Sequence, residues 1–319
     1  MIANTLYKLI GNRLSPAGPS ARLSILIYHR VLAQRDPLFP HEPTVETFDA
    51  QLGCLKRAFN VLPLHDAVKR LKTGTLPARA ACITFDDGYA DNLTLATPIL
   101  KKHRLHATVF IATAYLHGGR MFNDTVIEAI RRSALNVLNL DELGLGQFDI
   151  ADDGAKARAI GQILPQVKYL PVAERETKVA QIAALTACGA LPTDLMLSTE
   201  QLRQLHAAGM EIGGHTAQHP ILAKLNAEAA HKEIAAGKEY LENVLSERVR
   251  LFAYPNGKPG VDYLPQQAEI VRALGFDAAV STQGGTSTQT SDVFQLPRFT
   301  PWSPARARFV PALLDNLRR

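Results

Sequence analysis

Six short apolar segments recur along the chain, and each of them runs into polar or glycine-containing residues. They cover residues 23–29, 78–88, 106–112, 209–215, 249–257 and 275–282. Their shortness and their Val, Ile, Phe and Tyr content favour buried strands over helices. Amphipathic helical patterns lie between them, with Thr44 or Thr47, Asn226 and Pro265 as start signals. Because strands that alternate with helices pair in parallel, the chain is predicted to form an α/β sheet or barrel.

The 319 residues suffice for one large domain with an insertion, since single α/β barrels commonly reach about 200–250 residues. The stretch at about 119–200 breaks the alternation and is rich in Ala, Leu, Glu and Lys. We therefore expect a mostly helical insertion there. The predicted organisation is an N-terminal segment over 1–22, a main domain over 23–305 that contains the insertion, and a C-terminal helix over 306–319.

Charge and cysteine usage narrow the class of protein. The net charge is +5, and no basic run is interleaved with aromatic residues, so nucleic acid is not an expected partner. Three widely separated cysteines without C-x-x-C spacing fit reduced thiols in the cytoplasm. The N-terminal stretch has no uninterrupted apolar region and no 18-residue apolar span follows it, so we expect neither a cleaved signal peptide nor a membrane span. A helix with Ile2, Leu6, Leu9 and Ile10 on one side would still allow peripheral contact with the inner membrane surface.

Residues suited to chemistry follow directly after the predicted strands. They are His29, Asp86, Asp87, His215, His219 and the Pro-Asn-Gly of 255–257. In parallel α/β folds the carboxyl ends of the strands meet at one edge, where loops carry function without disturbing the core. We expect these side chains to lie together at that edge.

A divalent metal site is the interpretation that best accounts for this set. His215 and His219 are four residues apart, so one short turn can direct both imidazoles the same way, although Pro220 disfavours helical geometry there. Two imidazoles and the Asp87 carboxylate form a three-ligand set for Zn²⁺, with Co²⁺, Ni²⁺ or Mn²⁺ as alternatives. Asp86 is then predicted to take a proton from a metal-bound water, whose pKa falls towards ~7. Taken singly, each motif could also be a surface turn.

Two of these motifs resemble a known family. "TFDDGYADN" (84–92) and "HTAQHP" (215–220) are similar to the leading motifs of the polysaccharide deacetylases, the carbohydrate esterases with a NodB homology domain. The resemblance covers residues 24–118 and 198–300. It implies a distorted (β/α) barrel of about seven parallel strands. It also implies removal of acetyl from N-acetylated sugars, with Asp86 as base and Asp87, His215 and His219 as metal ligands.

The third motif of the family is altered in this chain. "LFAYPNG" has Ala253 where the family has an arginine that orients the base, and Asn256 where it has an aromatic residue. Arg298 is the candidate replacement for the arginine, with a structural ion pair as the alternative. The resemblance further implies that the turn at Pro255 keeps a backbone N–H near Asn256 for the oxyanion.

The late Leu-x-His motif of the family is absent near the C-terminus, and "ILIYHRV" (25–31) opens the domain instead. This arrangement resembles circularly permuted deacetylases that act on poly-N-acetylglucosamine. It makes His29 the predicted general acid for the departing amine. A strand-end histidine without chemistry is the alternative.

The predicted function is metal-dependent removal of N-acetyl groups from an N-acetylhexosamine-containing glycan or lipid-linked saccharide. Two alternatives stay open: a carbohydrate-binding pseudoenzyme that retains the metal, and a deacylase of a non-sugar amide. Aromatic residues near the strand ends could stack on sugar rings or belong to the core; they are Tyr89, Tyr254, Phe299 and Trp302.

Overall fold

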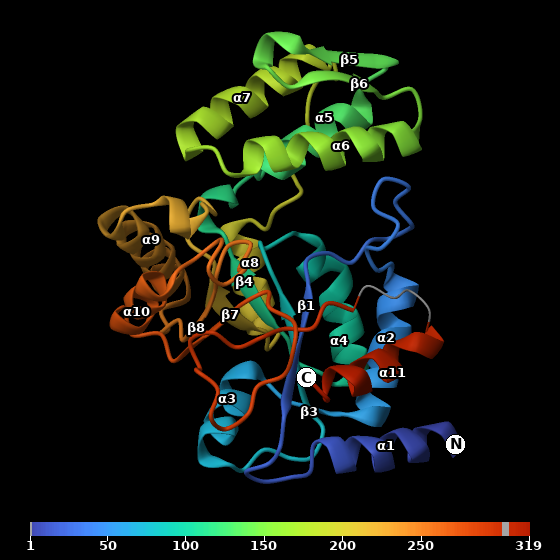
Figure 1. The fold of residues 1–319 in the computed structure, drawn as a ribbon, viewed down its shortest axis with the longest axis vertical. Helices are drawn as coiled ribbons and strands as arrows, with labels where there is room; N and C mark the ends of the chain where they lie inside the picture. Colours follow the sequence, from blue (N-terminus) through green and yellow to red (C-terminus); the bar gives the residue numbers. More distant parts are fainter. Residues whose placement is uncertain (1, 302–305) are drawn as a thin grey trace. The chain divides into compact units, whose positions relative to one another are not determined.

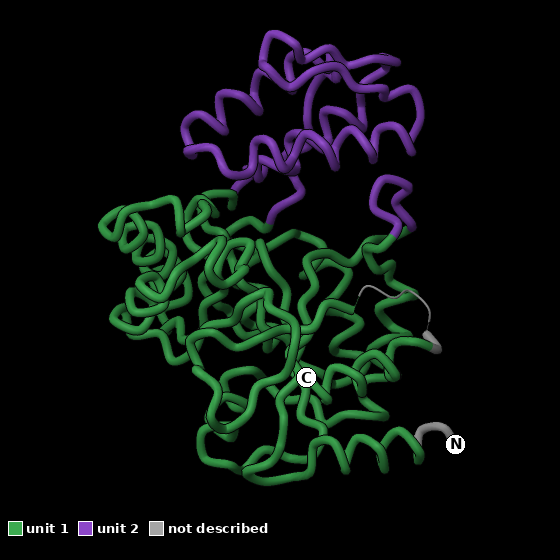
Figure 2. Tube along the Cα trace, in the orientation of Figure 1, with its two compact units in different colours: residues 1–34, 41–116, 197–319 green, residues 35–40, 117–196 purple. Residues whose placement is uncertain are grey.

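The computed structural model describes residues 2–301 and 306–319. It divides into two compact units (Figure 2). Unit 1 comprises Met1–Gln34, His41–Leu116 and Leu197–Arg319, and unit 2 comprises Arg35–Pro40 and His117–Met196. The longer segment of unit 2 corresponds closely to the insertion expected at about 119–200. The short segment Arg35–Pro40 comes from much earlier in the chain.

Unit 1 is built on a curled, all-parallel sheet (Figure 1). Its strand order is β1-β3-β4-β7-β8-β9, and the short β2 pairs with β3. The strands are β1 (Leu23–Tyr28), β2 (Asn60–Val61), β3 (Ala80–Phe85), β4 (Thr108–Ile111), β7 (Glu211–Gly214), β8 (Leu251–Ala253) and β9 (Ala278–Val280). Each of the six predicted apolar segments contains one of them. The half-barrel form confirms the predicted distorted barrel.

The segment after β9 links the two edges of the curled sheet. Leu296 exchanges backbone hydrogen bonds with the β9 edge, donating to Ala279 O at 3.0 Å and accepting from Ser281 N at 2.8 Å. Phe299 does the same on the other edge, donating to Ile25 O at 2.7 Å and accepting from Ile27 N at 3.0 Å. Arg298 lies between these two anchor points.

Helices cover the sheet of unit 1 and contribute side chains to its core. They are α1 (Ile2–Leu14), α2 (Val45–Ala58), α3 (Leu64–Thr73), α4 (Thr97–His103), α8 (Thr199–Ala207), α9 (Ala227–Leu245), α10 (Pro265–Ala273) and α11 (Arg306–Asn316). The expected caps are present: Thr44 accepts from Thr47 N, and Asn226 accepts from Ala229 N. Helix α2 buries Phe48 and other apolar residues of its inner face against β1 and β3, and each such side chain contributes ~1.5–3 kcal/mol.

Unit 2 has its own apolar core, and a short antiparallel pair of strands accompanies its helices. Its helices are α5 (Phe122–Arg132), α6 (Asp153–Lys168) and α7 (Val172–Leu185), and β5 (Val137–Leu140) pairs antiparallel with β6 (Gly146–Asp149). In β5 the alternate residues Leu138 and Leu140 are buried. This alternation is only four residues long, and the helix-forming composition around it hides the signal.

Candidate metal centre

The two adjacent aspartates sit on a tight turn at the carboxyl end of β3. Asp87 has φ +76° and Gly88 has φ +88°, so the chain turns at Asp87 itself and the two carboxylates can point to different places. Asp86 N–H donates to Tyr28 O at 3.0 Å, and Ala112 N–H donates to Asp87 O at 3.2 Å. Neighbouring strands thus fix the turn on both sides. A Cβ on Gly88 would lie 2.9 Å from Ile111, which requires glycine there.

His215 and His219 lie on the loop that follows β7, and this loop is not helical. Thr216 has φ +64° and His219 has φ +52°, and His219 N–H donates to Thr216 Oγ1 at 3.0 Å. The turn is therefore as short as Pro220 led us to expect, with left-handed residues where a helix would have regular ones. The two imidazoles meet edge to face with their centroids 4.7 Å apart.

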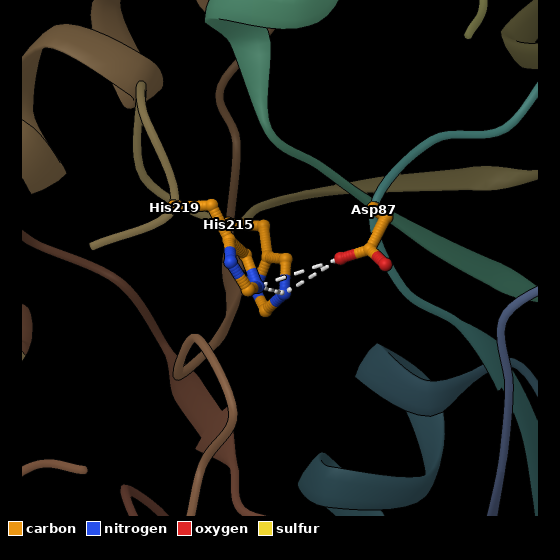
Figure 3. A group of neighbouring side chains, drawn as sticks. All are labelled: Asp87, His215 and His219. Carbon is orange, nitrogen blue, oxygen red and sulfur yellow. Dashed lines mark hydrogen bonds and ion pairs between the residues drawn. The ribbon is translucent and has the colours of Figure 1, made fainter. Parts of the chain in front are cut away.

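Three ligand atoms converge on one point (Figure 3). Asp87 Oδ1 lies 3.4 Å from His215 Nε2 and 3.5 Å from His219 Nε2, and the two Nε2 atoms are 3.1 Å apart. Ligands bound tetrahedrally to zinc at ~2.0–2.1 Å are separated by roughly 3.3 Å. All three residues are buried, at 1–7% exposure. The spacing and the burial fit a divalent metal ion.

The hydrogen bond of His215 defines which of its nitrogens faces the centre. His215 Nδ1 lies 2.7 Å from Ala253 O, and a carbonyl only accepts, so Nδ1 carries the proton. In the neutral ring, Nε2 then presents its lone pair towards Asp87. A backbone partner of this kind orients a metal-binding histidine.

Charges in the centre shift the pKa values of both partners. Burial alone would raise the pKa of Asp87, but the hydrogen bond to His215 and the charges of His219 and His29 lower it well below its usual range. Burial would lower the pKa of His215, yet its contact with Asp87 and the charge of Asp86 raise it overall. A cation therefore stabilises this site, either as a proton on the imidazole or as a metal ion.

Asp86 has a different environment from Asp87. Both of its oxygens accept from Arg298, Oδ1 from Nη1 and Oδ2 from Nη2, each at 2.7 Å. Arg298 is fully buried and is itself held by Ser281 O at 2.8 Å and Thr84 Oγ1 at 3.2 Å. Burial would raise the pKa of Asp86, but the Arg298 guanidinium lowers it below its ordinary value. The structure thus places Arg298 where it can orient the proposed base.

A hydrogen-bond network holds the backbone of His29 after β1. Asn92 Nδ2 donates to His29 O at 2.9 Å, Val31 N–H donates to Asp91 Oδ1 at 3.2 Å, and Arg30 Nε donates to Asp91 Oδ2 at 2.7 Å. His29 itself is half-buried, and its charge lowers the pKa values of Asp86 and Asp87. Sequence reasoning gave no function to Asp91 or Asn92. Their place at the end of the same motif, three and four residues after Gly88, was the signal that could have singled them out.

The aromatic candidates for sugar contact are mostly core side chains. Tyr254 is fully buried, stacks on Tyr263 at 3.7 Å and donates its hydroxyl to Phe294 O at 2.8 Å, so its ring has no surface for a sugar. Tyr89 is also buried, beneath the Arg30 guanidinium at 4.8 Å. Phe299 is half-buried and packs on the main core. Trp302 lies outside the described residues.

The Pro-Asn-Gly turn after β8 positions the backbone of Asn256. Pro255 is buried, Asn256 has φ +58°, and its carbonyl accepts from Thr282 Oγ1 at 2.7 Å. Among the described residues the Asn256 N–H has no hydrogen-bond acceptor. This donor is therefore available to a ligand.

Comparison with known proteins places the fold in a class. IcaB from Ammonifex degensii aligns with a TM-score of 0.61 at 19% identity, covering 96% of this chain and 99% of that one. The Streptococcus pyogenes deacetylase PplD in complex with acetate aligns with a TM-score of 0.60 at 20% identity, covering 93% and 98%. These likenesses define the class of fold, the curled parallel sheet of solved deacetylases.

A family model described as "Polysaccharide deacetylase" matches residues 73–139 and 159–279, more than half of the chain. The protein therefore belongs to the polysaccharide deacetylase family. A protein of Bacillus subtilis (strain 168) named "Putative polysaccharide deacetylase YxkH" is 20% identical over 280 residues, which is 87% of this chain and 71% of that protein.

Proposed function

We propose that the protein hydrolyses the N-acetyl group of an N-acetylhexosamine unit in a glycan or lipid-linked saccharide, with a divalent metal ion held by Asp87, His215 and His219. The observation that carries this proposal is the triangle of ligand atoms 3.1–3.5 Å apart, buried beside a carboxylate with its own arginine. When bound, a metal such as Zn²⁺ would supply Lewis-acid polarisation of the acetyl carbonyl and a more acidic water.

The residues around this site divide the remaining steps. Asp86, kept ionised and oriented by Arg298, accepts the proton of the attacking water. The water oxygen bonds to the acetyl carbon, while the N–H of Asn256 donates a hydrogen bond to the acetyl oxygen as negative charge develops there. His29 donates a proton to the nitrogen as the C–N bond breaks. The products are acetate and a free amino sugar.

Acetate release from N-acetylglucosamine oligomers and from lipid-linked N-acetylhexosamine tests the proposal. We expect release by zinc-loaded protein, its loss on chelation and its return with added metal. Asp86→Asn should lower the rate by about 10²–10⁴-fold while the bound zinc is retained, because Asp86 moves a proton and does not ligate. Loss of zinc in that variant would contradict the division between the two aspartates. Binding of oligomers without any acetate release would favour the pseudoenzyme.

A further inference from the structure

Helix α1 carries an apolar stripe on its outer side. Leu6, Leu9 and Ile10 are 52%, 63% and 36% exposed, and their spacing puts them on one face of the helix. They are three of the nine exposed large hydrophobic side chains found in the described part of the chain. Single exposed leucines are ordinary, but a continuous stripe on one helix marks an interaction surface.

The opposite side of α1 is fixed to unit 1, so the stripe cannot turn inward. Tyr7 and Leu14 pack against the main core. Gly11 is buried. A Cβ at this position would lie 2.6 Å from the Arg79 side chain and 3.2 Å from Leu314 of α11. Arg79 N–H donates to Ser15 O at 3.0 Å just beyond the helix. The helix therefore presents the stripe outward as part of the rigid fold.

The charge on the stripe is positive. Arg13 follows Leu9 by four residues and lies on the same face, whereas Lys8 projects from the flank of the helix away from Leu6 and Ile10; both are exposed, and neither has an ion-pair partner in the described structure. The first acidic residue of the sequence is Asp36, after five lysine and arginine residues. An unpaired cation beside exposed leucines suits a surface that is apolar within and anionic outside.

We propose that α1 docks the protein on an anionic membrane surface, with Leu6, Leu9 and Ile10 entering the headgroup and acyl boundary while Arg13 faces lipid phosphates. A second copy of the chain fits less well, since a twofold interface would bring Arg13 towards its own copy. Three side chains also fall far short of the ~800 Å² per partner of a stable protein interface. Among the described helices none is long and apolar enough to span a bilayer.

Vesicle flotation of the full chain tests this docking. We compare phosphatidylcholine vesicles with vesicles that also contain phosphatidylglycerol, at low and high salt. One cation at an anionic surface gives roughly fivefold tighter binding, so the wild type should bind the anionic vesicles preferentially and release them in salt. Equal binding to both vesicles, or none to either, would overturn the proposal.

Two variants separate the apolar and charged contributions. The triple variant Leu6→Ser, Leu9→Ser, Ile10→Ser should lose vesicle binding, and Arg13→Gln should lose the preference for anionic lipid. A matched triple variant, Leu135→Ser, Leu185→Ser, Leu264→Ser, removes leucines that are 39–40% exposed elsewhere and should bind like the wild type. Unchanged thermal unfolding establishes that each variant folds. A wild-type dimer that the first variant disperses, without any effect of lipid, would assign the stripe to a second copy instead.

Discussion

The two ends of the same parallel sheet both collect histidines and carboxylates, yet they are built differently. At the amino ends, a cavity of ≈ 250 Å³ is lined by ionisable residues, among them His65, His206, Glu211, Glu247, Arg248 and Arg250. At the carboxyl ends lie Asp86, Asp87, His215 and His219. By residue type alone, either end could be read as a site.

Pairing and burial distinguish the two ends. At the amino ends Asp277 binds His65 at 2.9 Å and Arg248 at 3.0 Å, and the interacting side chains are 15–48% exposed. At the carboxyl ends three electron-pair donors face one another at 3.1–3.5 Å, and their side chains are 1–8% exposed. At the amino ends, Asp277 already has His65 and Arg248 as partners within the protein. At the carboxyl ends, the three electron-pair donors need a cation that the protein itself does not supply. A buried convergence of electron-pair donors, and not a gathering of ionisable residues, therefore distinguishes the candidate metal site.

The largest expected effect comes from removing one histidine at each end. His215→Ala should lower bound zinc from one ion per chain to background and abolish acetate release, because two ligands remain for the metal. His65→Ala, the control from the amino ends, should keep the zinc. Metal content by mass spectrometry after loading and dialysis measures both. Equal zinc loss in the two variants would show that the comparison is wrong.

The second effect concerns the two arginine–aspartate pairs. Arg298→Met leaves Asp86 buried and unpaired, so we expect a loss of about 3–5 kcal/mol in the free energy of unfolding. Arg248→Met removes a partner of Asp277 that is 48% exposed, and it should cost about 1 kcal/mol or less. Urea unfolding compares the two. Arg298→Lys keeps the charge but not the bidentate geometry, and it should fall between them; equal losses for both arginines would contradict the assigned difference.

Some of this site could be predicted from the sequence, because its signal is local. Each strand ends where apolar residues give way to polar ones, and Asp87, His215 and His219 occupy such ends, so a parallel sheet brings them to one edge. The half-barrel itself followed from the same alternation of strands and helices. The metal ligands needed only spacing and topology, which a single sequence contains.

Other features depend on contacts that local patterns do not reveal. Arg298 lies 212 residues from Asp86, so only the resemblance and its altered third motif suggested the pair. Tyr254 follows a strand like the other candidates, but its hydroxyl donates to Phe294 O inside the core. No sequence pattern tells a tyrosine buried in this way from one that is exposed to a ligand. Likewise, no local pattern reveals that Asn92, which follows β3, donates a hydrogen bond to the backbone of His29, which follows β1.

A third, smaller effect is expected from the network at His29. Asn92→Ala removes the hydrogen bond to His29 O, and the resulting displacement of the imidazole should lower kcat about tenfold with KM little changed. Asn316→Ala is the matched control. Asn316 is also buried, and its Nδ2 donates a 3.1 Å hydrogen bond to Gly285 O, which is not part of the site. It should reduce stability without lowering kcat. If kcat falls alike in both variants, the effect of Asn92 is merely structural.

The smallest effect tests whether the amino-end cluster is structural, through its dependence on pH. Burial would raise the pKa of Asp277, but His65 and the two neighbouring arginines hold it below its ordinary value. A lowered pKa in the folded state stabilises the protein above the unfolded value of about 3.9, and this contribution disappears as the pH falls through the folded value. Asp277→Asn should therefore be about 1 kcal/mol or less below the wild type at neutral pH, and the two should converge in acid. Urea unfolding across this range measures the difference. A gap that widens on acidification would mean that the carboxylate is not stabilised by its partners, and the two ends would no longer differ as described.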